Sequence, residues 1–176
     1  MNKTNTKKLA IAAVFCAVAV VGSLFSVPVF GSKCSPVQHM VNILCAVLLG
    51  PGYGLGAAFA AALIRNLLGL GSLMAFPGSM IGAVCCGLAY MAFRKLWLTC
   101  IAEASGTGIL GGLAAYPVAK LMMGLNPGGL FVYIVPFLVS TVVGSILAYF
   151  LVTALQKGGV ISMYRHPAKK EMKMSQ

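Results

Sequence analysis

Apolar residues run along this chain in stretches of about 20, separated by short breaks. An α-helix needs about 20 apolar residues to cross a bilayer, and soluble domains do not show such runs in succession. We predict six spans, at residues 9–30, 37–50, 53–70, 78–94, 97–123 and 131–156. The second is short, so it is either tilted within a packed bundle or broken and partly re-entrant. The pattern predicts an all-α integral membrane protein with six transmembrane helices.

The charge of the chain lies between the apolar runs. Hydrophobic residues make up 60% of the sequence and charged residues 9%, the mean hydropathy is +0.95, and the formal net charge is +11. Six spans put most basic residues on one side: Lys3, Lys7, Lys8, Arg94, Lys95, Lys157, Arg165, Lys169, Lys170 and Lys173, against Lys33, Arg65 and Lys120 on the other. Because cytoplasmic segments are rich in Lys and Arg, we predict that both termini are cytoplasmic. The charge therefore reports topology and attraction to anionic lipid, not nucleic-acid binding.

The first apolar run is similar to a secretory signal peptide, with basic residues before it and Gly22-Ser23 near its end. Cleavage would leave five spans and move the basic tail across the membrane from Arg94 and Lys95, against the charge rule. We therefore keep this run as a helix. The chain then divides into a membrane domain, residues 1–157, and a basic cytoplasmic tail, residues 158–176.

Two polar clusters lie inside the apolar runs. Gln38, His39 and Asn42 open the second span on one helix face, and Arg65-Asn66 close the third. Polar groups in hydrocarbon cost free energy unless they find a partner. Two hypotheses explain both clusters: the side chains contact a ligand, or they form hydrogen bonds between helices. For Arg65 a third is open, in which its side chain snorkels to the membrane interface. The predicted topology puts all five residues toward the non-cytoplasmic side.

Glu103 is the one acidic residue inside a predicted span. It lies roughly two turns from the cytoplasmic end of the fifth span, well below Arg65, so we expect it to be alone and not paired with that arginine. It is either protonated, bonded to neighbours in its helix, or a ligand-binding or coupling group.

Further candidates lie near the outer side of the membrane. Ser79 is placed to cap the fourth span and Phe76 to stack on a flat ring. We expect Pro117 to kink the fifth span. Next to it, Tyr116 and Lys120 are four residues apart and share a helix face. The full outer set is Phe76, Ser79, Met80, Tyr116, Lys120 and Tyr133.

Small residues recur at helical spacing in two spans. Ala104, Gly108 and Gly112 predict close helix packing within the bundle. Ala10, Ala13 and Ala17 line a face of the first span, which suits either packing or docking on another protein. The outer connections, residues 31–36, 69–78 and 124–129, are rich in turn residues and form either a substrate entrance or ordinary connectors.

The sequence offers little for catalysis or for metal binding. It contains no G-x-x-x-x-G-K-[ST] loop, no H-E-x-x-H motif and no Ser/His/Asp set, so we expect neither an enzyme nor an ATP-binding chain. The six cysteines show no ligand spacing and are expected to fill the core as small apolar residues; we predict no metal site and no cofactor.

Several sequence blocks resemble the ThiW family. They are PVQHMVN (36–42), the Gly50-Pro51 turn, LIRNLLG (63–69), AFPGSMIG (75–82) and EASGTG (103–108). The resemblance covers the chain up to about Lys157. Members of this family are similar to substrate-binding S components of energy-coupling factor (ECF) vitamin transporters in prokaryotic cell membranes.

The resemblance implies a six-helix bundle with cytoplasmic termini that captures a vitamin precursor near its outer face. Its partners would be a transmembrane T component and two ATPase subunits, which use the ATP. The Ala13 to Ala17 stretch matches an Ala-x-x-x-Ala motif that contacts the T component. The implied substrate is hydroxyethylthiazole, the small neutral heteroaromatic precursor of thiamine.

Residue types then suggest how such a ligand would be held. Gln38, His39, Asn42 and Asn66 could supply polar contacts, with Phe76, Met80, Tyr116 and Tyr133 as the wall. Two alternatives stay open: an S component for another small vitamin precursor or heterocycle, and a non-transport, holin-like assembly protein whose polar groups serve helix packing alone.

Overall fold

The structure is a computed structural model that describes residues 3–29 and 32–159, so nearly all of the predicted basic tail lies outside the described residues. The helices are α1 (Lys3–Gly22), α2 (Pro36–Leu48), α3 (Pro51–Leu67), α4 (Ala75–Phe93), α5 (Leu96–Ser105), α6 (Gly112–Pro117) and α7 (Ile134–Lys157). Between them lie a 3-10 turn η1 (Ser23–Phe25), strands β1 (Val27–Val29) and β2 (Ser32–Cys34), and the π-helical segments η2 (Gly106–Gly111) and η3 (Val118–Met122). The described chain is predominantly helical, as the apolar runs predicted.

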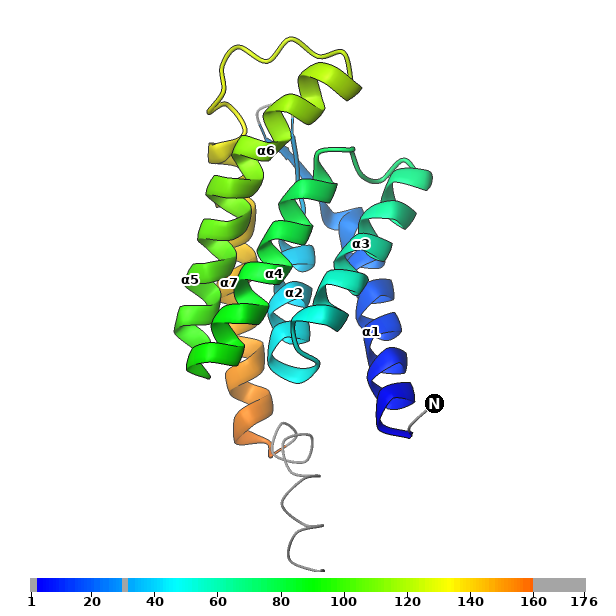
Figure 1. The fold of residues 1–176 in the computed structure, drawn as a ribbon, viewed down its shortest axis with the longest axis vertical. Coiled ribbons are helices and arrows are strands. Elements are labelled where there is room, and N and C mark those ends of the chain that lie inside the picture. The colour runs from blue at the N-terminus through cyan, green and yellow to red at the C-terminus, as the bar shows by residue number, and fades with distance from the viewer. Residues whose placement is uncertain (1–2, 30–31, 160–176) are drawn as a thin grey trace, which may run out of the picture.

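The helices lie side by side, and their connections gather at two opposite ends (Figure 1). The basic end holds the start of α1, the α2–α3 and α4–α5 turns and the end of α7. Lys8, Pro51 and Arg94 line one crevice there, and the Lys8 ammonium lies 5.9 Å from the centre of the Tyr53 ring. The loop end holds the β-hairpin and the connections α3–α4 and η3–α7. The basic segments therefore share one end of the bundle, which the charge rule requires of a cytoplasmic face.

Four helical segments of the described chain are long and apolar enough to cross a membrane: Asn5–Phe25, Ala75–Phe93, Leu96–Met122 and Ile134–Lys157. Helices α2 and α3 have only 13 and 17 residues. At 1.5 Å per residue they rise about 20 and about 26 Å, less than the roughly 30 Å of a bilayer core. The second span is thus as short as expected, and the third, predicted at residues 53–70, begins and ends two to three residues earlier than expected. The six-span topology stays a prediction.

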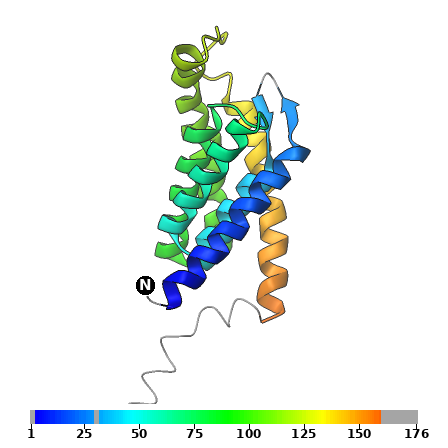
Figure 2. The same cartoon turned by 90° about the vertical axis from the view of Figure 1, so that its right-hand side faces the viewer.

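The first predicted span, residues 9–30, runs too far. Helix α1 ends at Gly22, and a hairpin follows in which Val27 pairs with Cys34, Pro28 with Lys33 and Val29 with Ser32 (Figure 2). The residue before a proline disfavours helical backbone, so Val27-Pro28 favours the extended conformation that both residues adopt in β1. Hydropathy alone could not separate this apolar strand from the helix before it.

The fifth predicted span is one helical segment whose winding changes three times. It passes from α to π winding at Gly106, returns to α at Gly112, and becomes π again directly after Pro117. Proline lacks the backbone donor that the α pattern needs, and Figure 1 shows the turns beyond α6 leaving the direction of α5. The predicted kink at Pro117 corresponds to this change.

Small residues allow the helices to approach closely, as predicted for the fifth span. A Cβ on Gly108 would collide with the side chain of Leu138, and one on Gly112 would lie 2.9 Å from the Cα of Ile134. All six cysteines are free, and Cys16 and Cys45 belong to the apolar cluster between α1, α2 and α3. Among the described residues no group of His, Cys, Asp and Glu could hold a metal ion.

Candidate functional site

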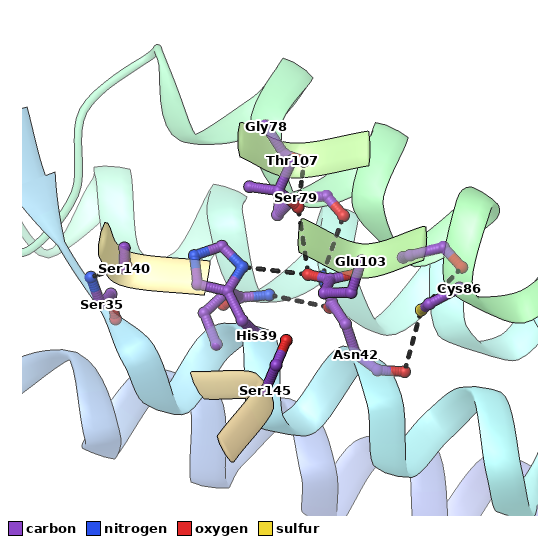
Figure 3. Close-up of polar contacts among 12 residues, drawn as sticks. Ser35, His39, Asn42, Gly78, Ser79, Cys86, Glu103, Thr107, Ser140 and Ser145 are labelled. Atoms are coloured by element: carbon purple, nitrogen blue, oxygen red, sulfur yellow. Dashed lines mark hydrogen bonds and ion pairs between the residues drawn. The ribbon is translucent and has the colours of Figure 1, made fainter. Parts of the chain in front are cut away.

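Asn42 joins the polar face of α2 to α4 and α5 in the interior of the bundle. Its Nδ2 donates to the backbone carbonyl of Ser79 at 3.1 Å and to Oε1 of Glu103 at 3.0 Å. Because a carbonyl can only accept, the contact with Ser79 identifies this atom as the amide nitrogen. The backbone carbonyl of Asn42 lies 3.7 Å from the thiol of Cys86. Asn42 is therefore a buried junction of three helices (Figure 3).

Glu103 is the centre of this cluster and is fully buried. Its Oε1 accepts hydrogen bonds from Asn42 and from the Thr107 hydroxyl at 3.1 Å, and it lies 3.0 Å from Nδ1 of His39. Figure 3 shows the carboxyl group between these three side chains. Its Oε2 has no partner among the described residues. The expected bonding to a neighbour in its own helix is present, through Thr107 four residues on, but Glu103 is not isolated from the other helices, because α2 brings His39 and Asn42 to it.

Arg65 reaches the same cluster through an amide. Its guanidinium donates to Oε1 of Gln38 at 3.2 Å, and Nε2 of Gln38 donates to Oδ1 of Asn42 at 3.4 Å. Arg65 is 3% exposed, so its guanidinium lies inside the helix bundle and the side chain does not snorkel to the membrane interface. The prediction that Arg65 and Glu103 do not pair directly is confirmed, and Gln38 and Asn42 connect them instead.

A narrow cavity of about 30 Å³ lies beside this cluster. Its lining comes from β2, the start of α2, the end of α3, the start of α4, η2 and α7. The lining residues are Lys33, Ser35, Gln38, His39, Arg65, Ala75, Gly78, Ser79, Thr107, Phe137 and Ser140. Asn42 and Glu103 are not in the lining, but they contact the lining residues Gln38 and His39 from the side away from the cavity. The sequence-predicted residues Gln38, His39, Arg65 and Ser79 therefore meet at one cavity, although they come from three helices.

Two polar contacts shape the outer part of the cavity. The backbone N–H of Ser35 donates to the Ser140 hydroxyl at 2.9 Å, while the Ser35 hydroxyl is buried without a partner in the described chain. The Lys33 ammonium donates to the carbonyl of Gly69 at 3.0 Å and so links the hairpin to the α3–α4 connection. This last bond is exposed at the loop end.

Several sequence candidates lie away from the cavity. The Asn66 amide donates to the carbonyls of Ala62 and Ser72 and thereby closes the end of α3. The Phe76 ring packs on Phe59, with the ring centres 5.7 Å apart. Met80, Tyr116, Lys120 and Tyr133 are also outside the lining. Their roles in ligand binding stay predictions.

Two local predictions about these candidates can be settled. Tyr116 and Lys120 do share a helix face, with the ammonium 5.9 Å from the ring centre. Ser79 does not cap α4: the helix begins at Ala75, and the Ser79 hydroxyl donates back to the Ala75 carbonyl at 2.7 Å. The helix starts earlier than the hydropathy suggested because Pro77 fits its first turn, where no backbone donor is needed.

Sequence reasoning missed Thr107, Ser35, Phe137 and Ser140. Thr107 follows Glu103 by four residues, so helical spacing could have pointed to it. Ser35 directly precedes the polar face of α2. Phe137 and Ser140 lie about 100 residues further along the chain, on α7, and only the packing of α7 on α2 brings them to the cavity.

Comparison with known proteins places this chain among membrane transporters. A family model described as thiamine-precursor transporter protein (ThiW) matches residues 9–158. The match includes every residue of the cavity and of the cluster behind it. No curated protein matches the chain.

Proposed function

This chain belongs to the ThiW family of thiamine-precursor transporter proteins, and we propose that it captures hydroxyethylthiazole, the thiazole precursor of thiamine, for import. The observation that carries the proposal is the cavity near the loop end, where Arg65, His39 and Gln38 are buried side by side. Buried polar groups at a small cavity are what a site needs to orient a small ligand. A membrane-embedded member of a transporter family is not expected to be an enzyme.

The chemistry of the cavity suits this precursor. Hydroxyethylthiazole is neutral and has an apolar aromatic ring, a ring nitrogen that accepts hydrogen bonds and a hydroxyl group. The Arg65 Nε–H and the Ser35 hydroxyl have no partner in the described chain and can meet such groups. Phe137, Ala75 and Gly78 supply apolar surface for the ring. A ligand that satisfies these buried groups gains more than an analogue that leaves them unpaired.

Ligand entry requires the walls of the cavity to separate. The cavity volume is about 30 Å³, whereas ligand pockets commonly measure about 300 Å³ or more. The hairpin and the α3–α4 connection border its outer part, and the exposed bond from Lys33 to Gly69 holds them together. Exposed polar contacts contribute little to stability, so this contact can open at low cost.

We further propose that the chain works as the S component of an ECF-type importer in a prokaryotic cell membrane, with its basic end and both termini cytoplasmic. Ala10, Ala13 and Ala17 all lie on the exposed face of α1, opposite the buried Ala12, Cys16 and Ala19. Small exposed residues in a membrane helix suit close approach of a partner helix. The partners would be a transmembrane T component and two ATPase subunits, which use the ATP, while this chain binds no cofactor.

A binding measurement on the purified full-length protein in lipid nanodiscs tests the proposal. Labelled hydroxyethylthiazole should bind, and the pyrimidine half of thiamine should not. Arg65→Gln should weaken binding about 10-fold to 100-fold, the loss expected for a hydrogen bond from a charged donor. Lys95→Gln, a charge removal at the basic end, is the matched control and should bind normally.

Two outcomes would overturn the proposal in different ways. Binding of the pyrimidine or of another heterocycle in place of the thiazole would mean an S component with a different substrate. Absence of binding to every precursor, with uptake by cells unaffected by Asn42→Ala and Asn66→Ala, would support a membrane assembly protein.

A further inference from the structure

The hydrogen bonds between Arg65 and Glu103 all run in one direction. The guanidinium donates to Gln38, the Gln38 amide donates to Asn42, and the Asn42 amide donates to Glu103. Each amide therefore turns its oxygen toward the arginine and its nitrogen toward the glutamate. Such a chain is polarised from a cationic donor to an anionic acceptor, and its bonds strengthen one another in a low dielectric. The arrangement fits a guanidinium at one end and a carboxylate at the other.

This polarity determines which nitrogen of His39 carries a proton. Nδ1 of His39 lies 3.0 Å from Oε1 of Glu103, the same oxygen that accepts from Asn42 and Thr107. A carboxylate can only accept hydrogen bonds. Nδ1 must therefore be the donor and must carry a proton.

The charge of the cluster determines the state of the other nitrogen. Arg65 and Glu103 are both buried, and a guanidinium paired with the carboxylate that the hydrogen-bond chain favours has no net charge. A second proton on His39 would leave a net positive charge inside the bundle, and an uncompensated buried charge is costly. Lys33, which lines the same cavity, would add repulsion. Nε2 of a neutral His39 has no proton and is a hydrogen-bond acceptor.

The free nitrogen faces the cavity. His39 belongs to the lining, and within the described chain no hydrogen bond engages its Nε2. Figure 3 shows the second ring nitrogen on the side of Ser35 and Ser140, away from Glu103. The nearby Ser35 hydroxyl is also buried without a partner.

We propose that the Arg65–Gln38–Asn42–Glu103 chain holds His39 with its proton on Nδ1, so that Nε2 selects ligands that bring a hydroxyl or N–H donor into the cavity. His39 is the contact residue, and Glu103 is a positioning residue that acts through it. The identity of the ligand rests on the proposed function. For hydroxyethylthiazole, the ligand hydroxyl would donate to His39 while the ring nitrogen accepts from Nε of Arg65.

The tautomer can be measured without any ligand. The chain has two histidines, so His166→Asn leaves His39 as the one labelled imidazole. In ¹⁵N-histidine spectra of this full-length variant in nanodiscs, Nδ1 should carry the proton and Nε2 should be unprotonated. Protonation of both nitrogens, or of Nε2 alone, would overturn the proposal.

A ligand pair then tests selection by Nε2. The 2-fluoroethyl analogue of hydroxyethylthiazole has nearly the same size but no donor, and it should bind about 10-fold to 100-fold more weakly, the loss expected for one hydrogen bond and an unmatched acceptor. In Glu103→Met the Nδ1 partner is lost, and the ratio of the two affinities should fall toward one. Glu103→Gln keeps an acceptor and should retain most of the ratio and the Nδ1–H signal.

The outcomes separate the two proposals. If Glu103→Met does not fold, the wild-type ratio and the Glu103→Gln spectrum still decide the question. Equal binding of alcohol and fluoride by the wild-type protein would overturn selection by His39 although the substrate proposal stands. Failure of both ligands to bind would refute the proposed substrate and, with it, the selection, while the spectrum would still report on the role of Glu103.

Discussion

Replacement of Gly82 by alanine should disrupt the polar cluster without removing any polar group. Gly82 lies on α4, where the helix faces Glu103 and Thr107. A Cβ built on Gly82 would collide with the Thr107 hydroxyl and would lie 2.8 Å and 2.9 Å from the two carboxyl oxygens of Glu103. Real Cβ atoms do not come this close to other atoms, so the carboxyl group, the threonine or the α4 backbone must move.

The size of the effect follows from what must move. Overpacking of a well-packed interior costs about 1–3 kcal/mol. Displacement of Glu103 also weakens its contacts with His39 and Asn42, at about 1 kcal/mol or more for each buried hydrogen bond. We expect Gly82→Ala to lower the thermal midpoint by several degrees and to weaken substrate binding by at least about 5-fold, the equivalent of one hydrogen bond of about 1 kcal/mol.

Gly56→Ala is the matched control. Gly56 is on the exposed side of α3, and a Cβ there would meet nothing within 4 Å. Alanine is favoured over glycine within a helix by about 0.5–1 kcal/mol, so this variant should be as stable as the wild type or more stable. Thermal unfolding in detergent and isothermal titration with hydroxyethylthiazole measure both variants. Equal midpoints and affinities for Gly82→Ala and the wild type would refute the close packing of α4 against Glu103.

Three further predictions concern other parts of the chain. Thr107→Val removes the hydroxyl that contacts Glu103 and Gly78 and should lower the free energy of unfolding by about 1–3 kcal/mol. Ser105→Ala, on the exposed side of the same helical segment, should lower it little; equal losses of stability in the two variants would argue against a special role for Thr107. Ala13→Trp should abolish copurification with a T component and leave precursor binding intact. Val139→Trp, on the exposed face of α7, is the control and should leave both copurification and binding intact; retained association in Ala13→Trp would exclude the α1 face as the docking surface. Lys33→Met removes the exposed bond to Gly69 and should speed ligand dissociation several-fold with little change in stability, and unchanged rates in stopped-flow binding would show that this contact does not restrain the opening.

The fold class could be predicted from the sequence because membrane insertion depends on the hydropathy of each segment separately. The positions of the long helices, the clustering of basic residues at one end and the close packing around Gly108 and Gly112 follow from local composition and spacing. The hairpin at residues 27–34 was missed because its first strand is as apolar as the helix before it. The end of the third span was placed at residue 70, three residues too late, because its apolar run continues beyond the last helical residue, Leu67.

The candidate site was predictable in part. Gln38, His39 and Arg65 were singled out because polar side chains are costly in an apolar chain, and that cost is visible at each position. The outer aromatic residues were chosen by type and estimated depth alone. Depth along the membrane does not determine the direction in which a side chain points, so Phe76 packs on Phe59 and Phe137 takes the place by the cavity.

The sequence by itself therefore determined that this is a helical membrane protein of the ThiW family, with buried polar residues that need partners. Only the tertiary structure decided which residues form hydrogen bonds with these polar side chains. Hydrogen bonds depend on distances of a few tenths of an ångström between helices that lie far apart in the sequence. Glu103, which looked isolated along its own helix, receives His39 and Asn42 from α2 because α2 packs between α4, α5 and α7.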